Sequence, residues 1–160
     1  MPFSPHDRAR LAEQLRKSEG LRLQAYRCTA GALTIGYGHN CDASPVPGIA
    51  REGDSITLDQ AESLLAADMD RSLGQVFGAL PWIDRLTPPR QAVLADMAFN
   101  MGLGVPGRSG LLSFTNTLRH VEHGEYAAAA EGMRASKWAR QVKGRALALS
   151  RQMESGQWQA

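Results

Sequence analysis

Apolar residues recur every three or four positions along most of the chain, and this period predicts a mainly helical protein. A first helix is predicted over 5–18. Ser4 and Asp7 resemble a capping box around Pro5, which suits the first helical position, and Gly20 follows as a stop. The chain therefore begins with a helix, and Glu19 lies at the end of that helix, directly before Gly20.

A second helix is predicted over 57–79. Thr57 and Gln60 form a capping box at its start, and no strong breaker follows until Gly74 or Gly78. Its apolar stripe consists of Leu58, Ala61, Leu65, Met69, Leu73 and Phe77. A helix of about 20 residues is roughly 30 Å long, which is enough to link two lobes of a small protein.

Between residues 21 and 39 the pattern shortens to a period of two, which is typical of a strand. The alternating residues are Leu33, Thr34, Ile35, Gly36, Tyr37 and Gly38. With a turn at Gly31, the segment predicts a small antiparallel hairpin, and the Ser-, Pro- and Gly-containing stretch over 40–53 predicts a loop.

Helical spacing returns after Thr87, Pro88 and Pro89, which are expected to cap a helix that ends by Gly102. A flexible loop over 104–110 follows. The remaining short helices are predicted over 114–123, 125–134, 137–141 and 145–154. Short strands followed by a run of helices indicate the α+β class.

Composition adds bounds on the function. The 160 residues fit one compact domain, and a net charge of +2 is too small to predict a nucleic-acid partner, although it suits an anionic polymer. Residues 134–151 carry six Lys and Arg and no Asp or Glu, so they form either a solvated helix face or a surface facing a substrate. Cys28 and Cys41 fit neither a disulfide framework nor a zinc motif, so free thiols and no metal are expected.

The first residues are rich in charge and contain no apolar core of a signal peptide. No stretch approaches the roughly 18 apolar residues of a membrane span. We therefore expect no export signal and no stable membrane insertion.

Chemistry concentrates between Glu19 and His39. The segment holds a carboxylate at a predicted helix end, the Cys28 thiol, and the hydroxyls of Thr29 and Thr34. Cleavage of a glycosidic bond needs a carboxylic acid on one side of the bond and a second group on the other face of the sugar. Spacing by itself does not separate such a pair from a surface glutamate, so both interpretations stay open at this point.

A resemblance to a known family favours the first interpretation. Glu19-Gly20-Leu21-Arg22-Leu23, Tyr26 and Thr34-Ile35-Gly36-Tyr37-Gly38-His39 resemble the signature of the phage-type lysozymes, glycoside hydrolase family 24, which includes the lysozyme of the T-even phages. The family has a Glu, an Asp or Cys, and a Thr at fixed intervals, and Glu19, Cys28 and Thr34 match both intervals. Weaker matches follow in the helical part, at 99–102, 114–118, 136–138 and 145–146.

The resemblance implies a role for each matching residue. Glu19 takes the position of the general acid, Cys28 the second catalytic position, and Thr34 that of the threonine that helps to hold the attacking water. Phe99 and Thr117 match substrate-binding positions in type. For each of them a purely structural role remains the alternative: a helix-terminal carboxylate for Glu19, a buried hydrophobe for Cys28, and a strand former for Thr34.

Three further residues are expected to support the site. The family places an arginine of the helical lobe against the acid, and Arg145 occupies that position. Asp68 falls on or near the apolar stripe of the long helix, where a carboxylate needs a partner, and His39 is the candidate. The alternative is that His39 and Asp68 do not pair and are unrelated residues of the surface.

The resemblance also implies the architecture and the reaction. One lysozyme-like domain over 1–160 would contain a small β-containing lobe over 19–56, a linking helix over 57–79, and a helical lobe formed by 80–160 with the first helix. The reaction would be hydrolysis of the β-1,4 bond between N-acetylmuramic acid and N-acetylglucosamine in bacterial peptidoglycan, by a monomer without cofactor or metal. Such an enzyme, made in the bacterial cytoplasm, would reach the wall through a holin-type lesion. A lytic transglycosylase and a catalytically inactive peptidoglycan-binding module are the alternatives.

Overall fold

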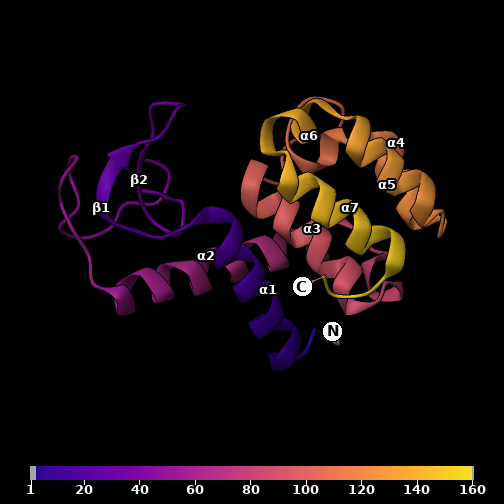
Figure 1. Cartoon of the computed structure of the whole chain (residues 1–160), viewed down its shortest axis with the longest axis horizontal. Helices are drawn as coiled ribbons and strands as arrows, with labels where there is room; N and C mark the ends of the chain where they lie inside the picture. Colours follow the sequence, from indigo (N-terminus) through magenta and orange to yellow (C-terminus); the bar gives the residue numbers. More distant parts are fainter. Residues whose placement is uncertain (1–2, 160) are drawn as a thin grey trace. The chain divides into compact units, whose positions relative to one another are not determined.

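The computed structural model describes residues 3–159, which fold into a small antiparallel sheet and a larger set of helices (Figure 1). In chain order the elements are α1 (Pro5–Glu19), β1 (Arg22–Arg27), β2 (Leu33–Gly36), β3 (His39–Asn40), α2 (Leu58–Ala79), α3 (Pro88–Met101), α4 (Thr115–Glu122), α5 (Tyr126–Ala135), α6 (Lys137–Val142) and α7 (Gly144–Ser155). The predicted α+β class is confirmed.

The chain forms two compact units. Residues Ala12–Arg71 form the first, which we call the sheet unit, and the residues up to Leu11 together with those from Ser72 onward form the second, the helical unit. The division falls inside α1 and inside α2, so each of these helices contributes to both units.

The three strands of the sheet unit pair in the order β1-β2-β3, all antiparallel. The predicted hairpin of β1 and β2 is confirmed, and Figure 1 shows the two strands side by side. The short β3 was not predicted: His39 was assigned to the end of the hairpin and Asn40 to the loop that follows. Because β3 pairs with β2 on the side away from β1, β2 becomes the central strand, and all four of its residues are buried.

Local signals define the starts of both helices that share the sheet unit. At α1 the Asp7 amide donates to Ser4 Oγ at 3.1 Å, and the Ser4 amide donates to Asp7 Oδ2 at 2.9 Å. At α2 the amides and side chains of Thr57 and Gln60 exchange the same reciprocal bonds, at 2.8 and 3.1 Å. Both predicted capping boxes are confirmed, because each satisfies two amides that the first helical turn leaves without partners.

The apolar stripe of α2 is mostly as predicted. Ala61, Leu65, Met69 and Leu73 are buried, but Leu58 is 50% exposed, and Val76 is fully buried instead. Leu58 is the first residue of the helix, and its placement on the stripe was wrong because the stripe begins to face a core only one turn later.

The helical unit is built around α3, nine of whose residues are buried. Helix α7 packs against α3 and α5, with α4 on α5 and α6 on α7, as Figure 1 shows. The helices were predicted to within a few residues of their ends. Thr87 is the N-cap residue of α3 and is followed by Pro88 and Pro89, as predicted, but its hydroxyl accepts no bond from the first turn and instead donates to the Gly156 carbonyl at 3.3 Å. Two 3-10 turns, η1 (Ile83–Arg85) and η2 (Leu111–Ser113), were not predicted.

Within residues 3–159, no helix combines the length and the apolar character that a membrane crossing requires.

Candidate active site

Glu19 is the last residue of α1. Gly20 has φ of +70°, a conformation that glycine adopts without strain, and it ends the helix so that β1 can begin at Arg22. The Glu19 carboxyl lies directly on the backbone of Gly38, where a Cβ atom would come 2.7 Å from Oε1. Gly38 also has a positive φ, of +73°, so both its conformation and the space beside it require glycine.

Cys28 follows β1 in the tight turn that leads to β2. Its amide donates to the Ala32 carbonyl at 3.0 Å, and the Gly31 amide donates to the Cys28 carbonyl at 2.8 Å. Hydrogen bonds from the backbone of Ala32 and then Ala30 lower the pKa of the Cys28 thiol below its ordinary value of 9.0, because they stabilise the thiolate. The Cys28 thiol is partly exposed and forms no disulfide. Cys41 is also a free thiol, but it is buried.

Thr34 lies on the central strand β2, opposite Tyr26 of β1 and Asn40 of β3. The side chain is 5% exposed, and its hydroxyl donates to the Ala32 carbonyl at 2.9 Å. The hydroxyl also contributes a hydrogen bond to the Cys28 thiol, which lowers the thiol pKa further. The structure therefore brings together two of the three predicted catalytic side chains at the turn end of the hairpin.

The sheet unit carries the Glu19 carboxyl at the end of α1 and, in the turn of the hairpin, a thiol whose pKa is lowered. Glu19 packs against Gly38, four residues along the chain from Thr34, and all three side chains belong to the sheet unit. A carboxylic acid together with a water-holding or basic pair is the equipment of a glycoside hydrolase. In the Gly-rich turn at 36–38, the Glu19 carboxyl occupies the space beside Gly38, while Ile56 and Ala61 lie beside Gly36.

His39 and Asp68 form a buried pair. His39 Nδ1 lies 2.7 Å from Asp68 Oδ2, and the side chains are only 4% and 8% exposed. His39 Nε2 donates to the Ser44 carbonyl at 2.8 Å, so both ring nitrogens meet acceptors. The hydrogen bond to Asp68 raises the pKa of His39 above its ordinary value of 6.5. Arg71 was not predicted; it adds a second bond to Asp68, at 2.7 Å.

Arg145 belongs to the helical unit, where its guanidinium pairs with Asp96 of α3. Nε and Nη2 lie 2.9 and 2.8 Å from Asp96 Oδ1, and the side chains are 9% and 1% exposed. The proximity of Arg145 to Glu19 stays a prediction. Asp96 was missed, although a carboxylate between Val93 and Met97 on an apolar helix is the same signal that singled out Asp68.

The two expected substrate-binding residues also belong to the helical unit. Phe99 is half-buried near the end of α3. Thr117 is 7% exposed on α4, and its hydroxyl occupies the space beside Gly132 of α5, where a Cβ atom would lie 2.8 Å from it. Their contact with substrate stays a prediction.

A pocket of about 600 Å³ was not predicted and lies within the helical unit. Its walls include Phe114 and Trp138, whose rings meet edge to face at 6.0 Å, and the hydroxyl of Ser136. Trp138 is fixed by a hydrogen bond from Nε1 to Asn100 Oδ1 at 2.8 Å. Fixed aromatic walls with a few polar groups are typical of a pocket for a small polar ligand.

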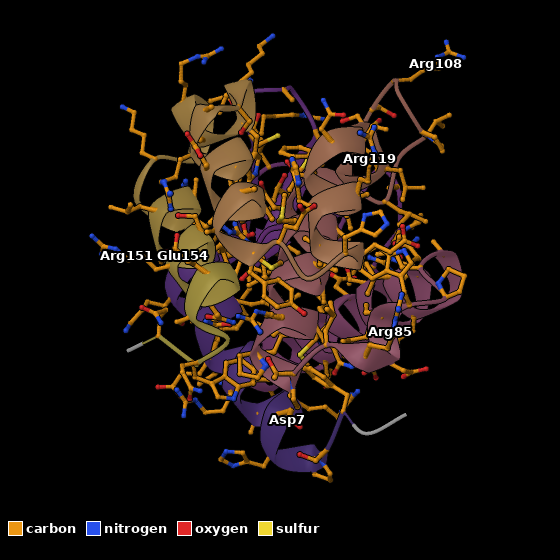
Figure 2. The ribbon with its side chains drawn as sticks, turned by 90° about the vertical axis from the view of Figure 1, so that its right-hand side faces the viewer. Asp7, Arg85, Arg108, Arg119, Arg151 and Glu154 are labelled. Carbon is orange, nitrogen blue, oxygen red and sulfur yellow. The ribbon has the colours of Figure 1, made fainter. Side chains whose placement is uncertain are left out.

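The basic stretch over 134–151 is mainly solvent-exposed; only Arg145 among its six basic residues is largely buried. Elsewhere on the helical unit, Arg108 reaches outward from the loop before α4 (Figure 2), and Arg119 of α4 is exposed and donates to Asn116 Oδ1 at 3.0 Å. On α7, Arg151 lies beside Glu154 (Figure 2). Within residues 3–159, no cluster of His, Cys, Asp and Glu suited to a metal ion occurs.

Comparison with known proteins identifies the relatives of the chain. The Phage lysozyme family model matches residues 16–154. The pre-baseplate central spike protein Gp5 of Enterobacteria phage T4 is 32% identical over 91% of the chain, which spans only 28% of that protein. An endolysin of Acyrthosiphon pisum secondary endosymbiont phage 1 is 35% identical over 77% of the chain and 75% of its own length. A probable T4-type lysozyme 2 of Dictyostelium discoideum is 27% identical over 91% of the chain and 94% of its length.

The family model spans both the sheet unit, with Glu19, Cys28 and Thr34, and most of the helical unit. The chain therefore belongs to the phage lysozyme family.

Proposed function

We propose that this chain is an endolysin that hydrolyses the β-1,4 bond between N-acetylmuramic acid and N-acetylglucosamine in bacterial peptidoglycan. The observation that carries the proposal is the sheet-unit site: a carboxyl packed on Gly38, with the Cys28 thiol and the Thr34 hydroxyl on the adjoining hairpin. Two of the relatives are named as an endolysin and as a probable T4-type lysozyme, and these names support the same activity.

In the reaction we propose, Glu19 donates its proton to the glycosidic oxygen as the bond between that oxygen and the anomeric carbon breaks. A water molecule attacks the anomeric carbon from the other face of the sugar. Thr34 positions the water, and the Cys28 thiolate receives its proton, so the product inverts configuration. If Cys28 attacked the sugar directly, the anomeric carbon would become bonded to sulfur, and hydrolysis of that thioglycoside bond would be slow. This favours attack by water over covalent attack by Cys28.

The substrate explains the remaining features. We propose that Phe99 and Thr117 contact the sugar chain, that the exposed basic residues of the helical unit favour the anionic wall polymer, and that the protein acts as a monomer without cofactor. The proposed site of action is the cell wall, reached from the cytoplasm after holin-type release.

The products of the wild-type protein test this function. Purified peptidoglycan should yield muropeptides with an intact reducing N-acetylmuramic acid, because water is added across the bond. Mass spectrometry separates them from anhydro products, which are lighter by one water. Anhydro ends would establish a lytic transglycosylase instead, and an absence of any cleavage would establish a binding module.

Cys28 should be needed as a thiolate. Cys28→Ser is expected to lower the rate of wall cleavage about a hundredfold, since a hydroxyl does not ionise near neutral pH, while Cys28→Asp should keep a large share. Because the thiol pKa is lowered, wild-type activity should rise with pH at values below 9.0, and this rise should be absent in Cys28→Asp.

Cys41→Ser provides the matched control, because Cys41 is the other free thiol but is buried away from solvent. It should keep the wild-type rate. A fully active Cys28→Ser would reduce Cys28 to a packing residue and leave the rest of the proposed function in place.

A further inference from the structure

One carboxylate of the sheet unit ties together three segments of the chain. Glu62, in the second turn of α2, accepts hydrogen bonds from Arg16 Nε at 3.1 Å and from Arg16 Nη2 at 2.6 Å. It also accepts a bond from the Tyr37 hydroxyl at 2.7 Å. Arg16 lies in the last full turn of α1, and Tyr37 follows the end of β2.

Glu62 joins the end of α1, which carries Glu19, to the turn on which the Glu19 carboxyl packs. Arg16 precedes Glu19 by three residues, so the two side chains lie on one side of α1. Tyr37 immediately precedes Gly38, the residue on which the Glu19 carboxyl packs. Any change in the distance between the end of α1 and the 36–38 turn would therefore move Glu19 relative to Gly38.

The Tyr37 hydroxyl makes this more than a surface ion pair. The Arg16 and Glu62 side chains are 42% and 35% exposed, so solvent screens their attraction and the pair by itself contributes little to stability. Tyr37, however, is only 8% exposed, and its hydroxyl reaches Glu62 from the inner side. The bonds from Arg16 and then Tyr37 hold the pKa of Glu62 below its usual value, which keeps it ionised as an acceptor for both.

We propose that Glu62 is a positioning residue for the catalytic acid: by holding Arg16 and Tyr37 at once, it fixes the Glu19 carboxyl relative to the hairpin that carries Cys28 and Thr34. The inference rests on the proposed role of Glu19. It is physically effective because misplacement of a reacting group by about 1 Å can cost up to a hundredfold in rate.

The test compares four variants by kcat and KM for reducing ends released from solubilised peptidoglycan. Tyr37→Phe removes a single hydroxyl and keeps the buried ring. Glu62→Ala removes the bonds from both Arg16 and Tyr37, and Glu62→Gln keeps one oxygen acceptor. We expect kcat to fall about tenfold in Tyr37→Phe and in Glu62→Ala, with KM unchanged, and Glu62→Gln to lie between Glu62→Ala and the wild type. The double variant, Tyr37→Phe with Glu62→Ala, should have a kcat no lower than that of Glu62→Ala alone.

Glu154→Ala is the matched control, because Glu154 pairs with Arg134 at similar exposure in the helical unit. It should leave kcat unchanged. Melting curves separate positioning from folding: a purely structural Glu62 would lower the melting temperature and leave kcat per folded molecule at the wild-type value, which would overturn the proposal.

A separate variant, Glu19→Gln, distinguishes a failed role for Glu62 from a failed role for Glu19. Wild-type kcat in Tyr37→Phe and Glu62→Ala, alongside an inactive Glu19→Gln, would overturn the role of Glu62 alone. Undiminished activity of Glu19→Gln would overturn both.

Discussion

Replacing Glu19 by glutamine is expected to slow wall cleavage about a thousandfold, because the amide fills the same space but has no acidic proton to give to the glycosidic oxygen. The shape of the site should persist, since glutamine can pack on Gly38 as the glutamate does. The measurement is turbidity clearing of Gram-negative cells with permeabilised outer membranes, together with the release of reducing ends from purified walls.

Glu13→Gln is the matched control, because Glu13 is an exposed glutamate on the same helix α1 and its replacement changes the net charge equally. It should clear cells at the wild-type rate. Glu19→Gln should still sediment with purified walls, which separates loss of chemistry from loss of binding. Clearing by Glu19→Gln at a rate comparable to the wild type would show that another group supplies the proton.

The helix starts were predictable because their signals are local. A capping box needs two side chains three residues apart, and both pairs, Ser4 with Asp7 and Thr57 with Gln60, form the expected bonds. The hairpin was predictable for the same reason, since a period of two around Gly31 reports a strand and its turn.

The burial of β2 could not be predicted from the alternation of apolar and polar residues along the strand. An alternating strand predicts one buried face and one exposed face, but Thr34 and Gly36 are buried together with Leu33 and Ile35. At Gly36 the covering atoms belong to Ile56 and Ala61, more than 19 residues further along the chain, and the spacing within the strand carries no signal of them. The environment of Cys28 was hidden likewise, because the thiolate is stabilised mainly by backbone groups of the turn, with a smaller contribution from the Thr34 side chain.

Pairs distant in sequence were predictable only where one partner stood out. Asp68 did, as a carboxylate beside an apolar stripe, and it lies against the expected His39. Glu62 did not, because a glutamate on a helix is ordinarily solvated, and its partners Arg16 and Tyr37 are 46 and 25 residues away. The hydrogen bonds that join Glu62 to Arg16 and Tyr37 were therefore visible only in three dimensions.

Replacing Asp68 by asparagine is expected to give the largest loss of stability. Removing one partner from a shielded ion pair leaves the other charge buried, which costs roughly 3–5 kcal/mol. Arg71, which is half-exposed, can turn to solvent, so we expect about 3 kcal/mol at mildly acidic pH. For a chain of this size that corresponds to a fall in melting temperature of roughly 6–12 °C.

The pH dependence of this loss identifies its cause. Both nitrogens of His39 meet acceptors, Asp68 Oδ2 and the Ser44 carbonyl, so the folded protein holds the protonated ring and its pKa lies above the ordinary 6.5. The stabilisation is therefore fully present below pH 6.5 and is lost as pH rises through the folded pKa. Melting temperatures of wild type and Asp68→Asn should converge as pH rises, while Asp59→Asn, an exposed carboxylate at the start of α2, should follow the wild-type curve. A difference between wild type and Asp68→Asn that stays constant with pH would mean that Asp68 acts through packing and not through the charge of His39.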